Sequence, residues 1–123
     1  MGIRLPSWLL VAGAVLCAGA PAALAHAFLD HAAPAVGSTV HQPPAEVRIW
    51  FTEELEPAFS TIKLADGTGA AVATGAAHVS DQDKKLLILP LPALPAGSYR
   101  VMWRVLSVDT HVTEGSFRFQ VTP

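Results

Sequence analysis

The chain has 123 residues, of which 51% are hydrophobic and 15% are charged. A chain of this length predicts one domain. Its formal net charge is −2 with histidine neutral. A mildly acidic chain with no run of basic residues is a poor candidate for holding a phosphate backbone, so we expect no nucleic-acid partner. Disorder is excluded as well, because large apolar residues recur along the whole chain.

The first 25 residues have the three parts of a secretory signal peptide. Arg4 carries the positive charge, residues 8–20 are an apolar stretch, and the small-x-small sequence Ala-Leu-Ala ends the segment. The apolar stretch is shorter than the roughly 18–20 residues that span a bilayer. We therefore expect cleavage between Ala25 and His26. It would remove the only cysteine and leave residues 26–123 as one secreted domain that has no disulfide.

Short stretches that alternate apolar and polar residues, separated by turn residues, follow the expected cleavage site. They predict strands within residues 26–32, 47–52, 61–64, 86–91, 99–105 and 117–121. The last strand is expected to begin at Gly115, and the Ala- and Gly-rich residues 67–77 are interpreted as a hairpin with weak edge strands. Trp50 and Trp103 are expected in or near the core. Six to eight short strands predict an all-β fold, either an antiparallel sandwich or a barrel.

Cleavage would make His26 the first residue, with a free α-amine beside its imidazole ring. The amine and the ring Nδ1 can close a chelate on one metal ion, and an amine pKa of about 7.7–8.0 makes loss of its proton easy near neutral pH. The alternative is that cleavage simply leaves a histidine at a frayed strand end. His26 is therefore a candidate metal ligand.

A second candidate pair is Asp109 and His111, which stand two residues apart between the last two predicted strands. Side chains two apart in an extended segment point the same way. The alternative is an aspartate that caps a turn beside a solvent-exposed histidine. Together with His26, the pair would supply three nitrogens and one carboxylate oxygen. That set suits Cu(II), whereas zinc prefers a tetrahedral arrangement.

The domain resembles the CopC family of periplasmic copper-binding proteins over nearly all of residues 26–123. The matching segments occur in order, and the ordered set is far more specific than any single piece. They are residues 26–29, 34–37, 51–53, 56–60, 94–101, 103–107, 109–111 and 115–119. The resemblance implies an Ig-like, small Greek-key β-barrel or sandwich of about seven strands.

The resemblance also implies a Cu(II) site that holds one copper ion per mature chain. The family's ligands match His26, through its amine and imidazole, together with Asp109 and His111. A family glutamate near the site matches Glu53 as an axial or neighbouring group, and the adjacent Glu54 is an alternative match. The implied protein buffers or carries copper in the periplasm, for resistance or homeostasis, and would serve an inner-membrane copper transporter of the CopD type.

Two features depart from the family pattern. Some members bind Cu(I) through a methionine-rich loop, but the mature chain has one methionine, Met102, so we expect no separate Cu(I) site. Val112 stands where many members have a proline after the loop histidine. The other histidines are not expected to bind metal: His31 is expected to face away from the site, and His41 and His78 are expected in exposed polar turns.

No enzyme is predicted from these residues. Ser107, Asp109 and His111 lie too close along one loop to act as nucleophile, base and orienting group. Two alternatives to the copper carrier stay open. Copper monooxygenases also chelate copper with an N-terminal histidine and a second histidine, but Asp109 would stabilise Cu(II) and fill a position that oxygen needs. The other alternative is a β-sandwich interaction module whose histidines bind no metal.

Overall fold

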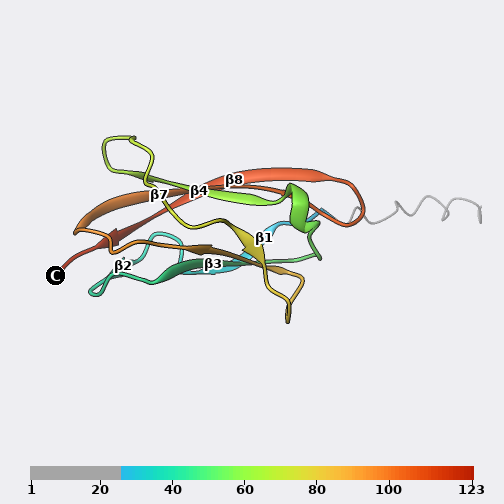
Figure 1. The fold of residues 1–123 in the computed structure, drawn as a ribbon, viewed down its shortest axis with the longest axis horizontal. Helices are drawn as coiled ribbons and strands as arrows, with labels where there is room; N and C mark the ends of the chain where they lie inside the picture. Colours follow the sequence, from blue (N-terminus) through green and yellow to red (C-terminus); the bar gives the residue numbers. More distant parts are fainter. Residues whose placement is uncertain (1–25) are drawn as a thin grey trace, which may run out of the picture.

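The structure is a computed structural model that describes residues 26–123, and these residues form two four-stranded β-sheets packed face to face (Figure 1). The strands are β1 (Leu29–Ala33), β2 (Thr39–Val40), β3 (Glu46–Phe51), β4 (Thr61–Asp66), β5 (His78–Val79), β6 (Leu86–Pro90), β7 (Gly97–Leu106) and β8 (Val112–Val121). A 3-10 helix, η1 (Pro57–Phe59), precedes β4. The signal peptide predicted for residues 1–25 lies outside the described residues. Within residues 26–123, no helix is long and apolar enough to cross a membrane.

The chain crosses from sheet to sheet, so most strands that follow one another in sequence are not neighbours. One sheet has the strand order β1-β3-β6-β5 and the other has the order β2-β8-β7-β4. β3 pairs antiparallel with β6, whereas the short β2 pairs parallel with the end of β8. Such crossings are typical of Greek-key sandwiches. The predicted all-β fold is confirmed, with eight strands in the described residues where about seven were expected.

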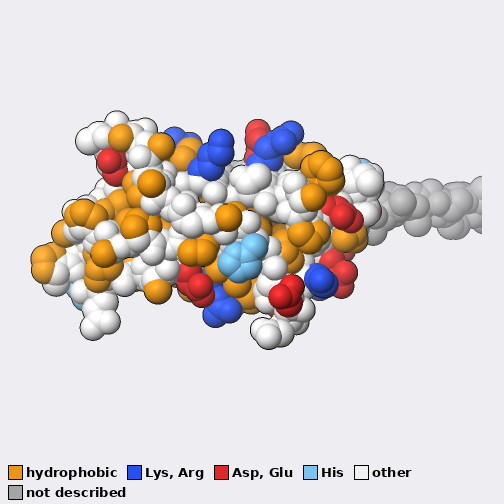
Figure 2. Space-filling view, viewed as in Figure 1, with side chains coloured by type: hydrophobic (Ala, Val, Ile, Leu, Met, Phe, Trp, Pro, Cys, Tyr) orange, Lys and Arg blue, Asp and Glu red, His pale blue; other side chains and the backbone are white. Residues whose placement is uncertain are grey.

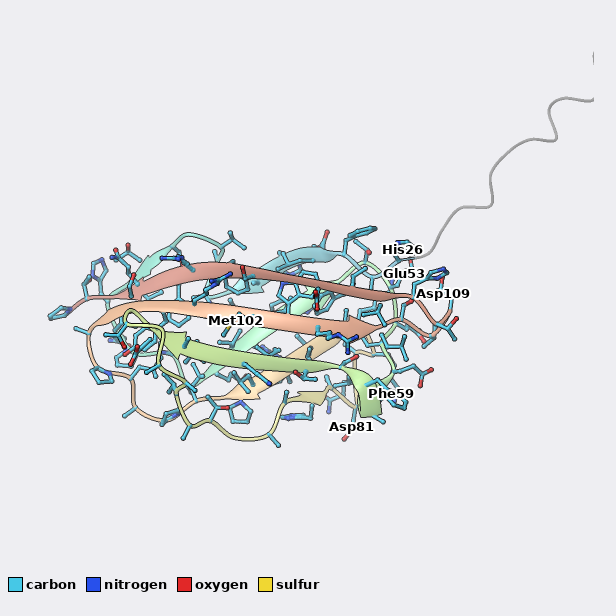
Figure 3. The ribbon with its side chains drawn as sticks, turned by 90° about the horizontal axis from the view of Figure 1, so that it is seen from above. His26, Glu53, Phe59, Asp81, Met102 and Asp109 are labelled. Atoms are coloured by element: carbon cyan, nitrogen blue, oxygen red, sulfur yellow. The ribbon has the colours of Figure 1, made fainter. Side chains whose placement is uncertain are left out.

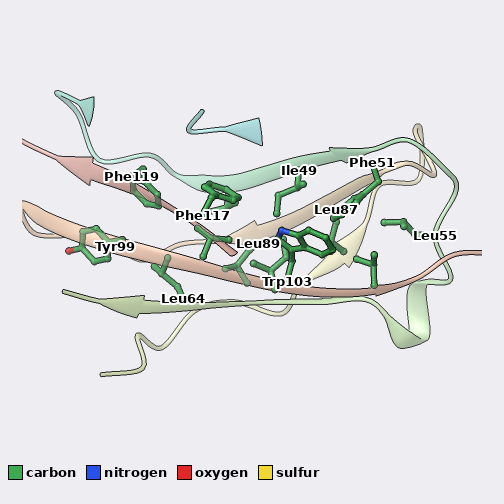
Figure 4. Close-up of a cluster of buried hydrophobic side chains, with 14 of the residues drawn as sticks. Ile49, Phe51, Leu55, Leu64, Leu87, Leu89, Tyr99, Trp103, Phe117 and Phe119 are labelled. Atoms are coloured by element: carbon green, nitrogen blue, oxygen red, sulfur yellow. The ribbon is translucent and has the colours of Figure 1, made fainter. Parts of the chain in front are cut away.

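One hydrophobic core lies between the two sheets (Figure 4). It is built from side chains that alternate inward, as in β3, where Val47, Ile49 and Phe51 are buried and the residues between them are not. The ring of Trp103, from β7, packs edge to face against Phe51 with ring centroids 5.1 Å apart. Each large apolar side chain buried in this way contributes about 1.5–3 kcal/mol. Such a core can stabilise the domain without a disulfide.

The longest hairpin of the molecule consists of β7 and β8. Ten residue pairs run from Gly97 opposite Val121 to Leu106 opposite Val112. The turn between these strands, residues 107–111, therefore projects from a long, fully paired ladder at one end of the sandwich. Because the ladder fixes the backbone on both sides of the turn, the side chains of the turn are held in a defined position.

β8 begins at Val112, three residues earlier than expected, and Gly115 lies inside the strand. Gly115 stands opposite Trp103 in the ladder. A Cβ atom at Gly115 would lie 2.6 Å from Cζ2 of the Trp103 ring, closer than carbon atoms can approach. The glycine therefore makes room for the tryptophan. The sequence predicts a turn at this glycine, because close packing between strands cannot be distinguished from a turn by sequence alone.

The hairpin predicted within residues 67–77 is formed only in part: the chain turns back against β4, and the Val72 N–H donates to the Leu64 carbonyl at 2.9 Å. After the turn at the end of β4, this segment makes one isolated bridge, between Ala65 and Ala71, and contains no strand. The next strand in the chain is β5, which begins at His78 and forms one edge of the β1-β3-β6-β5 sheet. That histidine was expected in a polar turn; its side chain is exposed, but it belongs to a strand paired with β6.

Trp50 lies on the outer face of its sheet and not in the core. It is half-buried in β3, where its ring stacks on His31 of β1 with centroids 4.4 Å apart and an interplanar angle of 8°. Trp103, by contrast, is buried as expected, with 8% of its surface exposed. The difference follows from strand alternation. Trp50 falls between the inward-facing residues Ile49 and Phe51, so its side chain points outward.

Candidate metal centre

The N-terminal residues of the described chain are anchored beside the β7–β8 turn. The first strand begins at Leu29, later than expected, and the residues before it are held by two threonines. Thr113 of β8 donates a hydrogen bond to the carbonyl of Ala27 at 2.5 Å, and Ala27 is fully buried. Thr52, just after β3, accepts a hydrogen bond from the Phe28 N–H at 2.9 Å. These contacts hold the preceding residue at the end of the sandwich.

The turn between β7 and β8 is closed by its own backbone. The N–H of Thr110 donates to the carbonyl of Ser107 at 2.8 Å, and the N–H of Ser107 donates to the carbonyl of His111 at 3.0 Å. Thr110 has a φ of 71°, a left-handed conformation that is costly for a β-branched residue. This strained residue separates Asp109 from His111, so the turn reverses the chain between the two candidate ligands.

Ser107 organises the two candidate ligands of the turn. Its side chain is fully buried, and its hydroxyl donates to Oδ1 of Asp109 and accepts a hydrogen bond from the His111 N–H at 3.3 Å. The same carboxylate oxygen lies 3.3 Å from Nδ1 of His111. The hydrogen bond from Ser107, followed by the neighbouring His111, lowers the pKa of Asp109 below its usual value. The carboxylate is therefore ionised and oriented across the neutral pH range.

The rings of His26 and His111 lie against each other although they are far apart in sequence. Their centroids are 4.3 Å apart, with an interplanar angle of 40°. Nε2 of His26 is buried and has no hydrogen-bond partner among the described residues. A buried ring nitrogen without a partner is costly, so the His26 ring has a nitrogen that is available to a ligand.

Glu53 lies at the same end of the sandwich as His26 and Asp109 (Figure 3). It is half-buried in the loop after β3. This loop is attached to the β7–β8 turn by a hydrogen bond of 3.1 Å from the Val108 N–H to the carbonyl of Glu54. No hydrogen bond or ion pair within residues 26–123 joins the Glu53 carboxylate to the other three candidates.

The four candidate residues come from three segments, and contacts join three of them. His26 contacts His111, and His111 contacts Asp109. Within residues 26–123, no group of three or more His, Cys, Asp or Glu side chains is arranged to hold a metal ion. A complete site therefore needs another donor or a turn of a side chain. Nitrogen and carboxylate donors of this kind suit a divalent transition metal.

Sequence reasoning missed Ser107, Thr52 and Thr113 as parts of this centre. Ser107 was considered only as a nucleophile, yet its hydroxyl orients the aspartate and the turn. The available signal was the position of this serine, which continues the alternation of buried residues along β7. The two threonines hold the N-terminal residues, and nothing in the sequence indicated this, because their partners are backbone atoms from a distant segment.

Comparison with known proteins places this geometry in a family. Residues 29–122 match the family model described as the CopC domain. The protein YobA of Escherichia coli K12 is 38% identical over 102 residues, which cover 82% of each chain. Copper resistance protein C of Escherichia coli is 33% identical over 120 residues, covering 91% of this chain and 94% of that one. The crystal structure of CopC from Methylosinus trichosporium OB3b has a TM-score of 0.76 and 39% identity, covering 80% of this chain and 95% of that one.

The fold and the centre define a small, two-sheet β-sandwich with paired histidines at one end. The family match spans most of the chain, and the relatives match it over most of their own length. The chain belongs to the CopC family.

Proposed function

We propose that the mature protein binds one Cu(II) ion in the periplasm and buffers or carries it for copper resistance or homeostasis. The ligands are His26, through its α-amine and imidazole, together with Asp109 and His111. The observation that carries this proposal is the contact of the His26 and His111 rings at 4.3 Å. Family membership and the name of the relative copper resistance protein C support copper as the metal.

The proposed chelate depends on signal cleavage after Ala25. In the uncleaved chain, the nitrogen of His26 is an amide and a poor ligand. After cleavage it is an amine with a pKa of about 7.7–8.0, which gives up its proton to a metal ion near neutral pH. The anchors at Ala27 and Phe28 support this proposal, because they hold the backbone directly after His26 and leave the residue itself to bind.

The role of Asp109 favours binding over catalysis. Its low pKa keeps an anionic oxygen beside His111. An anionic ligand in the plane of the copper stabilises Cu(II) against reduction and occupies a position that oxygen would need. We therefore propose a carrier and not a monooxygenase. Glu53 at the same end is proposed as an axial or neighbouring group, and a CopD-type inner-membrane transporter as the protein that the carrier serves.

The test is a copper titration of two purified proteins that differ at one position. The first begins at His26, and the second carries one added alanine before it. The first should bind one Cu(II), with a tetragonal, nitrogen-rich EPR spectrum. The second should bind more weakly by orders of magnitude, because its nitrogen is an amide. His41→Ala is the matched control: its ring bonds Thr122 on another part of the chain, and its loss should leave the affinity unchanged.

Three results would contradict the proposal, each in a different way. Equal affinity of the two proteins would exclude the N-terminal chelate. Copper binding no tighter than to an unrelated peptide would favour the interaction module. Oxidation of a polysaccharide by the copper-loaded protein with ascorbate would favour the monooxygenase.

A further inference from the structure

The outer face of the β4–β7–β8 part of the sheet carries an unusual concentration of positive charge. Residues 26–123 contain seven Lys and Arg residues and ten Asp and Glu residues, a formal charge of −3. Four of the seven cations project from this one face: Lys63, Arg100, Arg104 and Arg118. The outward residues of the three strands include one carboxylate, that of Glu114, and Asp66 at the end of β4 lies at the edge of the face beside Arg100 and Arg118. With both carboxylates counted the face carries +2, and the rest of residues 26–123 carries −5.

The register of the strands places the arginines in two groups, Arg104 at one end and Arg100 with Arg118 at the other, with Met102 and Lys63 in the row between them. In one row Arg104 of β7 lies between Thr61 and Glu114, and two rows along Arg100 lies beside Arg118. Met102 occupies the middle row with Lys63. Figure 3 shows Met102 in the middle of the sheet. Residues two apart on a strand are about 6.6 Å apart, so the two arginines of β7 lie about 13 Å from each other.

This basic face is hollowed and not flat. A hollow of about 650 Å³ is lined by residues of all three strands, among them Lys63, Arg100, Met102 and Arg104. A second hollow of about 370 Å³ adjoins it and shares Arg100 and Met102. In Figure 2, Lys and Arg side chains line the upper side of the molecule, where Figure 1 places β4, β7 and β8.

The cations of the basic face form few ion pairs with the protein's own carboxylates, and the Asp66 carboxylate is hydrogen-bonded within its own turn. Among the ion pairs of residues 26–123, one joins this face to an acid, Arg104 to Glu114 at 3.5 Å, and both side chains are mostly exposed. An exposed pair of this kind contributes only about 0–1 kcal/mol. Arg100 donates to the hydroxyl of Ser116 at 3.2 Å. The guanidinium groups can therefore exchange these contacts for the carboxylates of another molecule.

We propose that the basic face is the docking surface for an acidic, extended segment of a partner protein. The segment would place carboxylates against the two arginine groups and an apolar side chain over Met102, whose flexible thioether adapts to different shapes. Charge complementarity of this kind guides association and fixes orientation. This docking does not depend on a bound metal.

An anionic membrane is a poorer match for the same face. A planar bilayer surface would leave the hollow over Met102 unfilled. The domain as a whole is negative, so an anionic bilayer repels it at long range, whereas a short acidic segment meets only the basic face. The face also extends to Val112, the residue after His111. A docked partner would thus lie beside the end of the sandwich proposed to bind copper, a consequence that rests on the proposed function.

The test uses metal-free protein and a defined peptide at low salt. The probe is an end-blocked nine-residue peptide with two glutamates on each side of a central leucine and serines elsewhere. NMR chemical shifts should change at the outward-facing residues of β4, β7 and β8. The double variant Arg100→Glu/Arg118→Glu should weaken binding by about tenfold or more, equivalent to about 1.4 kcal/mol. The charge-conserving Arg100→Lys/Arg118→Lys variant should bind within about threefold of the original protein.

The matched control is the double variant Lys84→Glu/Lys85→Glu, which changes the net charge equally but lies in the loop before β6. Its affinity for the peptide should be unchanged. The proposal is wrong if this control weakens binding as much as the arginine reversals, since net charge alone would then explain the effect. It is also wrong if the peptide shifts no residue of the basic face, or if phosphatidylglycerol vesicles bind through this face while the peptide does not.

Discussion

Two turns of this protein place an aspartate at a strand end, and they use its carboxylate differently. In the turn after β4, Asp66 accepts hydrogen bonds from the N–H groups of Thr68 at 2.9 Å and Ala70 at 3.1 Å, and from the Thr68 hydroxyl at 2.6 Å. In the turn between β7 and β8, Asp109 is bonded by the Ser107 hydroxyl and lies beside the His111 ring. The first carboxylate closes its own turn, whereas the second is directed at another side chain.

The two turns also differ in the residue that adopts the left-handed backbone conformation. The turn after β4 places Gly69 at a positive φ of 89°, and glycine adopts this conformation without strain. The β7–β8 turn places Thr110 there, at 71°. Both aspartates have a pKa below the usual value because of hydrogen bonds. A low carboxylate pKa alone therefore does not identify a binding site; the identity of its partners and the strain around it do.

The largest expected difference between the turns is in copper binding. His111→Ala should weaken Cu(II) affinity by about 100-fold or more, since even the loss of a group that orients a ligand typically costs about 10- to 100-fold. Asp109→Ala should weaken it as well, whereas Asp66→Ala should leave the affinity unchanged. Competition titrations of the protein beginning at His26 measure all three. An equal loss for Asp66→Ala would mean that the effect comes from folding.

Removal of the Ser107 hydroxyl tests whether its effect on copper binding, through the position of Asp109, can be separated from its effect on the stability of the fold. Ser107→Ala should lower the free energy of unfolding by about 1–3 kcal/mol, because buried polar groups lose their partner, and it should also weaken copper binding. Ser60 is the matched control: it is buried, with 5% of its surface exposed, and its hydroxyl donates to the carbonyl of Glu56 at 2.9 Å. Ser60→Ala should destabilise similarly without a change in affinity, as measured by urea unfolding and copper titration.

Exchange of the positive-φ residues should have opposite effects in the two turns. Thr110→Gly removes about 1–2 kcal/mol of left-handed strain and adds about 0.5–1 kcal/mol of unfolded-chain entropy, so it should stabilise the protein slightly. Gly69→Ala should destabilise it by about 1 kcal/mol, although no atom lies within 4 Å of the new Cβ. Thermal unfolding measures both. Destabilisation by Thr110→Gly would show that the threonine is not strained.

The smallest expected effect is the pH dependence that Asp66 contributes. Hydrogen bonds, chiefly from the Thr68 side chain, lower its pKa in the folded protein. Folding therefore favours the ionised form: the stabilisation is complete above the unfolded pKa of about 3.9 and is lost as the pH falls through the lower folded pKa. Asp66→Asn should reduce the fall in melting temperature below about pH 4. A steeper fall in the variant would contradict the sign of the shift.

Most of the fold was predictable from the sequence, and the errors have particular causes. The inward alternation in β3 and β7 predicted the core, because side chains alternate across a strand whatever the strand packs against. Trp50 was misassigned although the same alternation places it on the outer face of β3. Gly115 was misassigned because the space beneath Trp103 depends on the neighbouring strand. Local pattern carries no information about such contacts.

The candidate site was also predictable only in part from the sequence. The sequence by itself determined the candidate donor types, since His26 follows a predicted cleavage signal and Asp109 and His111 stand two residues apart. Tertiary structure alone decided that the His26 ring meets His111 at 4.3 Å, that Ser107 orients the carboxylate, and that four cations share one sheet face. The physical reason is that these contacts join segments far apart in the chain, and only the packing of the two sheets and the register of their strands bring them together.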